Sequence, residues 1–183
     1  CMSAYYPDGE SIEEPSVPDD RAYPEDPIAE DDQPAAEAAI AFLRRKRDQP
    51  FLLGVSLHNP HDICYYVMDK LPADHPSAAV RRHTREAEYP PLPANFARDP
   101  EEPELIRLSR ERKVYGPENT FTKGWDERMW RSYLYAYYRM AERADGLIGR
   151  LLGALRETGQ EDNTLIAFTS DHGEGMAAHQ WVV

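Results

Sequence analysis

The apolar residues of one short stretch recur at helical spacing. Residues 34–48 have an apolar side chain at every third or fourth position, which predicts a helix with one buried face (Ala36, Ala39, Ile40 and Leu43). Asp31 or Asp32 can cap its start, and the basic run 44–47 suits the negative end of the helix dipole. Pro50 ends the pattern, and the continuously apolar residues 51–57 then predict a fully buried strand.

A longer stretch with the same spacing runs from about Asp126 to Glu157, and Gly159 is a natural C-terminal stop. We interpret its apolar stripe as core packing rather than as a ligand site, because the period matches a buried helix face (Trp130, Tyr133, Leu134, Tyr137, Ala141, Ala144, Leu147, Ile148, Leu151 and Leu155). Residues 164–170, TLIAFTS, predict a second buried strand.

The order helix, strand, long helix, strand predicts an α/β fold with a parallel sheet and crossover connections. Ligand sites in such sheets gather at the carboxyl ends of the strands. We therefore expect the polar residues after Leu57 and after Thr169 to lie at the same edge of the sheet.

Proline interrupts the pattern between these elements. Residues 70–124 hold eight prolines, which exclude long regular elements but allow a short helix at Glu104–Arg112. A loop region of this length is typically functional or irregular, and we interpret it as a substrate-facing excursion.

Composition divides the chain further. The net charge of −12 is concentrated at the front, where residues 1–38 hold twelve acidic residues and a single base, Arg21. We therefore expect an acidic irregular segment at 1–33 and one partial catalytic domain at 34–183. No basic face favours nucleic-acid binding, no apolar run approaches the ~20 residues of a membrane span, and Cys1 and Cys64 make no disulfide framework.

Residues that can bind a metal ion or transfer a proton follow both predicted strands. His58, Asn59, Pro60, His61 and Asp62 come after the first, in HNPHDIC, and SDHGEG comes after the second. Within the second cluster, Asp171 offers hard oxygens and His172 a nitrogen to a divalent cation, and Gly173 lets the backbone turn beside it. His61 can donate to a sulfate or phosphate oxygen, or transfer a proton near neutral pH.

These residues carry a family resemblance. HNPHDIC is similar to the HxPH element of the sulfatase family, within the alkaline phosphatase superfamily, and FTSDHGEGMAAHQW resembles that family's later metal-binding strand end. The resemblance covers most of residues 34–183 and implies part of an alkaline-phosphatase-like sandwich, with a mostly parallel central sheet flanked by helices.

The resemblance also implies roles for individual residues. Asp171 and His172 resemble the later pair of ligands to the active-site calcium, in some members magnesium, and His61 resembles the catalytic histidine that contacts the sulfate. His179 falls where some members place a catalytic residue close to the substrate, or it is a histidine without a catalytic part. His58 binds substrate, or it is a supporting residue that orients the loop.

Sulfatases of this family use a formylglycine nucleophile made from the cysteine or serine of a C-x-P-S-R type motif, and an early Asp-Asp pair completes their metal site. Cys1 lacks the proline and arginine of that motif, and the acidic pairs 19–20 and 31–32 do not follow an apolar strand. We expect the chain to be a piece of a longer protein, whose missing N-terminal region carries the formylglycine.

The resemblance implies a metal-assisted sulfuric ester hydrolase that acts on a sulfated small molecule or saccharide, in a periplasmic, secreted or lysosomal location. The isolated chain is expected to be inactive. A phosphodiesterase or phosphonate monoester hydrolase of the same superfamily is an alternative, as is a non-catalytic relative that binds anionic glycans.

Overall fold

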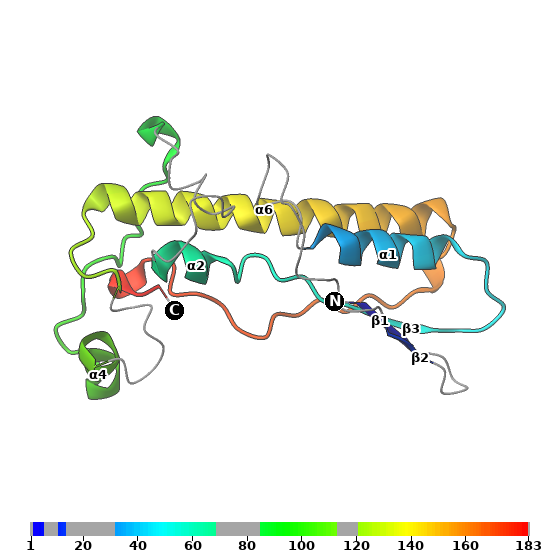
Figure 1. Cartoon of the computed structure of the whole chain (residues 1–183), viewed down its shortest axis with the longest axis horizontal. Coiled ribbons are helices and arrows are strands. Elements are labelled where there is room, and N and C mark those ends of the chain that lie inside the picture. The colour runs from blue at the N-terminus through cyan, green and yellow to red at the C-terminus, as the bar shows by residue number, and fades with distance from the viewer. Residues whose placement is uncertain (1, 6–10, 14–31, 69–84, 113–120, 183) are drawn as a thin grey trace. The chain divides into compact units, whose positions relative to one another are not determined.

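The structure, a computed structural model, describes residues 2–5, 11–13, 32–68, 85–112 and 121–182, without side chains for the first two ranges. The chain divides into two compact units, which we describe separately. Unit 1 comprises Cys1–Pro60 and Met140–Ala167, and unit 2 comprises His61–Arg139 and Phe168–Val183. The long helix α6 (Glu127–Glu157), labelled in Figure 1, contributes residues to both units.

Unit 1 contains a three-stranded sheet in the order β2-β1-β3, made of β1 (Met2–Tyr5), β2 (Ser11–Glu13) and β3 (Leu52–Val55). Both pairings are antiparallel, with Met2 opposite Val55 and Ser3 opposite Glu13. The expectation of parallel pairing is thus wrong for the described strands, because apolar patterning reports burial and not strand direction. The expectation of an irregular 1–33 segment is wrong at β1 and β2, because β1 pairs both with β2 and with the distant β3. Residues 6–10 and 14–31 lie outside the described residues.

The predicted first strand is present but is not fully buried. Leu53 and Val55 pack against the core of unit 1, whereas Leu52 is 68% exposed, so only one face of β3 is covered among the described residues. The predicted second strand is wrong: residues 164–170 form no strand, and Leu165 and Phe168 are 96% and 81% exposed. An apolar segment becomes a strand only by pairing, and no described strand pairs with this one.

The helix predicted at 34–48 is confirmed as α1 (Gln33–Arg44), with an earlier end. One face packs on the C-terminal part of α6 and forms the core of unit 1 (Ala39, Ile40, Phe42, Leu43, Ala154 and Leu155). Arg47 closes the C-terminus of α1, because its guanidinium donates to the carbonyl of Phe42 and lies 3.4 Å from the centre of the Phe42 ring.

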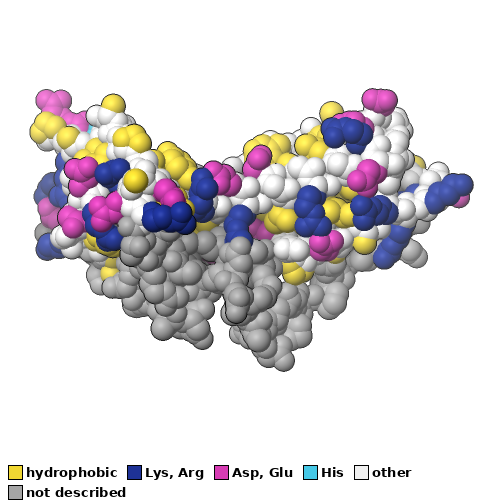
Figure 2. Space-filling model, turned by 90° about the horizontal axis from the view of Figure 1, so that it is seen from above, with side chains coloured by type: hydrophobic (Ala, Val, Ile, Leu, Met, Phe, Trp, Pro, Cys, Tyr) yellow, Lys and Arg dark blue, Asp and Glu magenta, His cyan; other side chains and the backbone are white. Residues whose placement is uncertain are grey.

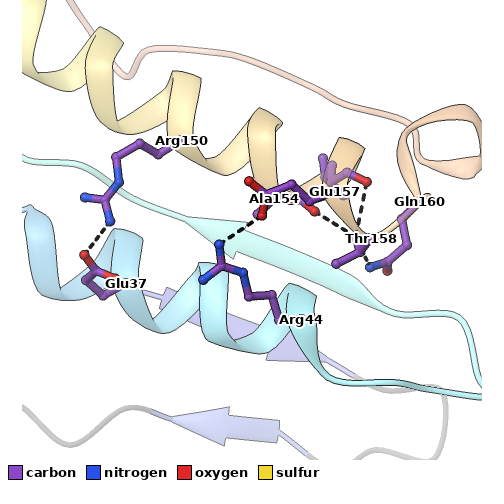
Figure 3. Close-up of polar contacts among 8 residues, drawn as sticks. Glu37, Arg44, Arg150, Ala154, Glu157, Thr158 and Gln160 are labelled. Atoms are coloured by element: carbon purple, nitrogen blue, oxygen red, sulfur yellow. Dashed lines mark hydrogen bonds and ion pairs between the residues drawn. The ribbon is translucent and has the colours of Figure 1, made fainter.

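Polar contacts flank this core (Figure 3). Arg44 pairs with Glu157 at 2.9 Å, and Arg150 pairs with Glu37, so each helix supplies one basic and one acidic side chain. Such exposed pairs contribute little to stability, because solvent screens their charges. The amide of Gln160 donates to the carbonyl of Leu43 over 2.8 Å and joins the two helix ends.

Helix α6 ends where the sequence predicts. Gly159 adopts a φ of +67°, and the N–H of Gln160 donates to the carbonyl of Leu155 over 2.9 Å, which is the Schellman arrangement. A short helical turn, η2 (Glu161–Asn163), follows and leads into the extended segment 164–170.

Unit 2 is built around aromatic residues. Helix α2 (Ile63–Met68), which the sequence did not suggest, brings Tyr66 to the N-terminal part of α6, where its hydroxyl lies 2.7 Å from that of Ser132. Edge-to-face and tilted ring contacts, with centroids 5.0–6.4 Å apart, join the members of this cluster (Tyr66, Phe96, Trp125, Trp130 and Tyr133). Interpreting the aromatic stripe of α6 as core is therefore correct here.

The described parts of the proline-rich region also belong to unit 2. They contain η1 (Glu86–Glu88) and α4 (Glu104–Arg112), and α4 has the bounds that the sequence predicts. Arg131 of α6 donates to the carbonyls of Tyr89 and Pro90 over 2.9 and 3.0 Å, so residues 85–90 lie against α6.

No helix in the described ranges is both long and apolar enough to cross a membrane. Acidic and basic side chains are interspersed over the visible described surface in Figure 2.

Candidate active site

In unit 1, the loop after β3 is anchored by a buried carboxylate. Asp32, 2% exposed, accepts hydrogen bonds from the backbone N–H groups of His58 and Asn59 and from the side-chain amide of Asn59, the last two over 2.8 Å. Asp32 does occupy the N-cap position of α1, but its side chain makes no capping hydrogen bond there. The predicted role of Asp32 as a side-chain cap is therefore wrong, because its carboxylate binds three donors of the 58–59 loop instead.

Replacing Asp32 with alanine is expected to lower the free energy of unfolding by about 2–4 kcal/mol, because buried donors of the loop then lack an acceptor. Urea unfolding measures the change, and Asp48→Ala, at an exposed position, is the matched control. Equal stability of the two variants would contradict the anchoring role.

His61 opens the first segment of unit 2. Its carbonyl accepts from the N–H of Cys64 over 3.1 Å at the start of α2, which fixes the backbone, while its side chain is 54% exposed. Nδ1 of His61 lies 3.9 Å from the nearest Asp62 carboxylate oxygen, too far for a hydrogen bond. The backbone of His61 is thus held in place, while its imidazole is exposed to solvent.

The second cluster lies beside this imidazole. The ring centroids of His61 and His172 are 6.3 Å apart, so unit 2 brings together one residue from each polar cluster. His58 belongs to unit 1, and no described contact joins His179 to this pair.

Asp171 and His172 form a small polar turn. The backbone N–H of His172 donates to Oδ1 of Asp171 over 2.9 Å, and Nε2 of His172 lies 3.8 Å from Oδ2. This backbone hydrogen bond, together with one from the N–H of Asp171 itself, lowers the pKa of Asp171. The carboxylate, 88% exposed, is therefore ionised and accessible to a cation.

The ring of His172 is oriented by its own backbone. Its Nδ1 lies 3.3 Å from the carbonyl of Gly173, and because a carbonyl only accepts, this contact requires the proton on Nδ1. When the ring is neutral, the lone pair is therefore on Nε2, which lies 3.8 Å from Oδ2 of Asp171. Two donors of the kinds that bind divalent cations thus lie side by side.

A complete metal site needs more than these two donors. Calcium takes about six to eight oxygen ligands. No group of three or more His, Cys, Asp or Glu side chains suited to a metal ion occurs in the described part of the chain. Asp171 and His172 therefore fit a metal only as part of a site to which other residues contribute.

His179 lies elsewhere in unit 2, in a turn that includes η3 (Ala178–Gln180). It borders a cavity of about 300 Å³, which Trp181 of the same segment lines together with residues of α4 such as Ile106 and Arg110. Sequence patterning did not indicate Arg110, Trp181 or Asp32 as part of any site, because each acts through a contact with residues far away in the chain.

Comparison with known proteins identifies the family. The sulfatase family model matches residues 5–181. The chain belongs to the sulfatase family. This confirms the resemblance carried by the HNPHDIC and FTSDHGEGMAAHQW segments.

This sulfatase chain is similar to several named proteins. The Delta 4,5-hexuronate-2-O-sulfatase of Bacteroides thetaiotaomicron is 28% identical over 87% of this chain and 32% of its own length. The iduronate 2-sulfatase of Mus musculus is 30% identical over 82% of this chain and 27% of its own length. A solved structure of a 2-O GAG sulfatase matches with a TM-score of 0.62 at 23% identity, over 93% of this chain and 35% of that chain.

At that identity the structural likeness shows that the sulfatase chain shares the fold of its neighbours. The chain spans about a third of the length of the relatives and the structure that it matches.

Proposed function

We propose that the protein containing this chain hydrolyses sulfate esters of saccharides, and that residues of unit 2 form part of its active site. The observation that carries this proposal is the approach of His61 to His172, with ring centroids 6.3 Å apart, in a chain of the sulfatase family. An exposed imidazole beside an ionised carboxylate and a second imidazole suits an anionic ester that needs both a proton donor and charge neutralisation.

The residues of this chain would have separate roles in the reaction. His61 would donate to a sulfate oxygen and move a proton during ester cleavage. Asp171 and His172 would supply two of the ligands of a calcium or magnesium ion, through the carboxylate and Nε2. Such an ion, when bound, stabilises negative charge on the sulfate.

The further parts of this proposal concern the whole protein. The nucleophile would be a formylglycine outside residues 1–183, and the protein would work in a periplasmic, secreted or lysosomal compartment. Its catalytic domain would be an alkaline-phosphatase-like sandwich with a mostly parallel central sheet.

The names of the relatives suggest the substrate class. Two of them act on hexuronate or iduronate at the 2-O position, so we propose a 2-O-sulfated uronate residue of a saccharide as the substrate. Turnover of a 2-O-sulfated uronate disaccharide by the full-length protein is the direct test, with a 6-O-sulfated glucosamine disaccharide, a chromogenic aryl sulfate and a phosphate diester for comparison. Faster turnover of the phosphate diester than of every sulfate ester would refute sulfatase function.

The 183-residue chain by itself is expected to hydrolyse none of these esters, because its described residues supply two metal donors and the nucleophile is proposed to lie outside it. Incubation of the chain and of the full-length protein with the same aryl sulfate and saccharides measures this. Release of sulfate by the chain alone would contradict the proposed division of the site.

A further inference from the structure

The segment that carries His179 has an unusual backbone. Met176, Ala177, His179 and Gln180 have φ values of 50°, 62°, 51° and 58°, in the left-handed region that residues with a Cβ disfavour. Several such residues close together persist only where the surroundings hold them in place.

Arg110 of α4 binds the backbone of this turn. Its Nη1 donates to the carbonyl of Gln180 and its Nη2 to that of His179, each over 2.6 Å. Its side chain is 7% exposed, and its guanidinium lies 4.8 Å from the ring centre of Trp181. The planar guanidinium group thus hydrogen-bonds two successive backbone carbonyls and packs on the side chain of the following residue, Trp181.

The charge of Arg110 is balanced locally. Its Nε donates to a carboxylate oxygen of Glu102 over 3.2 Å, and the Glu102 side chain is 15% exposed. A buried guanidinium needs such a partner. Glu102 therefore orients the guanidinium and leaves its two Nη groups for the turn.

Residues just before α4 fix the His179 ring itself. The His179 N–H donates to the carbonyl of Asn95 over 2.7 Å, and Nδ1 lies 3.0 Å from the carbonyl of Ala97. Because a carbonyl only accepts, this contact requires the proton on Nδ1 and leaves the lone pair of the neutral ring on Nε2. The imidazole is exposed, so Nε2 is the nitrogen available to a ligand.

We propose that Arg110 is a positioning residue, which with Glu102 holds the left-handed turn so that His179 presents Nε2 to the substrate. This inference rests on the proposed function, since it requires His179 to act on a sulfate ester. It gives the described part of the proline-rich region a role as a support for a catalytic histidine.

A double-mutant cycle in the full-length protein tests the proposal. Arg110→Gln is expected to lower kcat for the 2-O-sulfated uronate disaccharide by about 10- to 100-fold, since misplacement of a catalytic group by about 1 Å can cost that much. His179→Ala is expected to lower kcat at least as far, and the double variant no further than His179→Ala alone. Arg107→Gln is the matched control, because Arg107 lies on the same helix with its side chain 51% exposed, and its kcat should stay at the wild-type value.

Either of two results would overturn the proposal: a wild-type kcat for His179→Ala, or additive losses in the double variant. If Arg110→Gln does not fold, Arg110→Lys replaces it in the cycle. Lysine keeps the buried positive charge but lacks the two Nη groups that bind the carbonyls of His179 and Gln180.

A measurement without substrate separates this inference from the proposed function. In protein labelled with ¹⁵N-histidine, the His179 signals should report the Nδ1–H tautomer in wild type and a mixture of tautomers in Arg110→Gln. If wild type hydrolyses no sulfate ester but this tautomer change occurs, the proposed function fails and the support of His179 by Arg110 stands. An unchanged tautomer in a folded Arg110→Gln variant would overturn the positioning role itself.

Discussion

Replacing His61 with alanine in the full-length protein is expected to lower kcat on a 2-O-sulfated uronate saccharide by about 10²- to 10⁴-fold, the usual effect of losing a general acid–base group. The reason is geometric. The His61 backbone is fixed at the start of α2, and the exposed His61 ring lies 6.3 Å from that of His172, beside the Asp171–His172 turn. Steady-state kinetics with saturating substrate measures the loss.

His58→Ala is the matched control for this variant. Its N–H still donates to Asp32 after the substitution, so the loop keeps its anchor and only an exposed ring is removed. We expect a smaller loss of kcat than for His61→Ala, with any effect of His58 on substrate binding seen in KM. A loss at His58 as large as that at His61, or none at His61, would contradict the proposed assignment.

Replacing Asp171 with asparagine is expected to lower both calcium affinity and kcat by about 100-fold or more, since a bound cation contributes several kcal/mol of charge stabilisation and each 1.36 kcal/mol is tenfold in rate. The wild-type carboxylate is 88% exposed and its pKa is lowered, chiefly by the His172 backbone N–H, so it meets a cation in its charged form. The amide has no such charge.

Calcium titration by calorimetry, metal content after dialysis and kcat together measure this effect. Asp145→Asn is the control, because Asp145 is an exposed aspartate of α6 in unit 1. Treatment of wild type with a chelator should reproduce the kcat of Asp171→Asn, and added calcium should restore wild type but not the variant. An Asp171→Asn variant with wild-type calcium affinity would exclude Asp171 as a ligand.

Helices were the most predictable part of this fold. The start and end of α6, the bounds of α4 and the core face of α1 follow from local spacing, from Gly159 and from proline positions. Amphipathic helices satisfy their own backbone hydrogen bonds, so their pattern needs no knowledge of partners.

Strands were less predictable for the opposite reason. Residues 2–5 and 52–55 pair across a long stretch of chain, and the apolar residues 164–170 find no pairing partner among the described residues. A strand exists only through its neighbour, so apolar character alone predicted one strand correctly and another wrongly.

For the candidate site, the sequence by itself determined which chemical groups are present: imidazoles at His61, His172 and His179 and a carboxylate at Asp171, in the order typical of sulfatases. Only the tertiary structure decided which groups meet. It placed the rings of His61 and His172 together, turned Asp32 from a helix cap into a loop anchor, and set Arg110 under the His179 turn. These contacts join residues far apart in the chain, and side-chain reach depends on how the connecting elements pack, which no local pattern records.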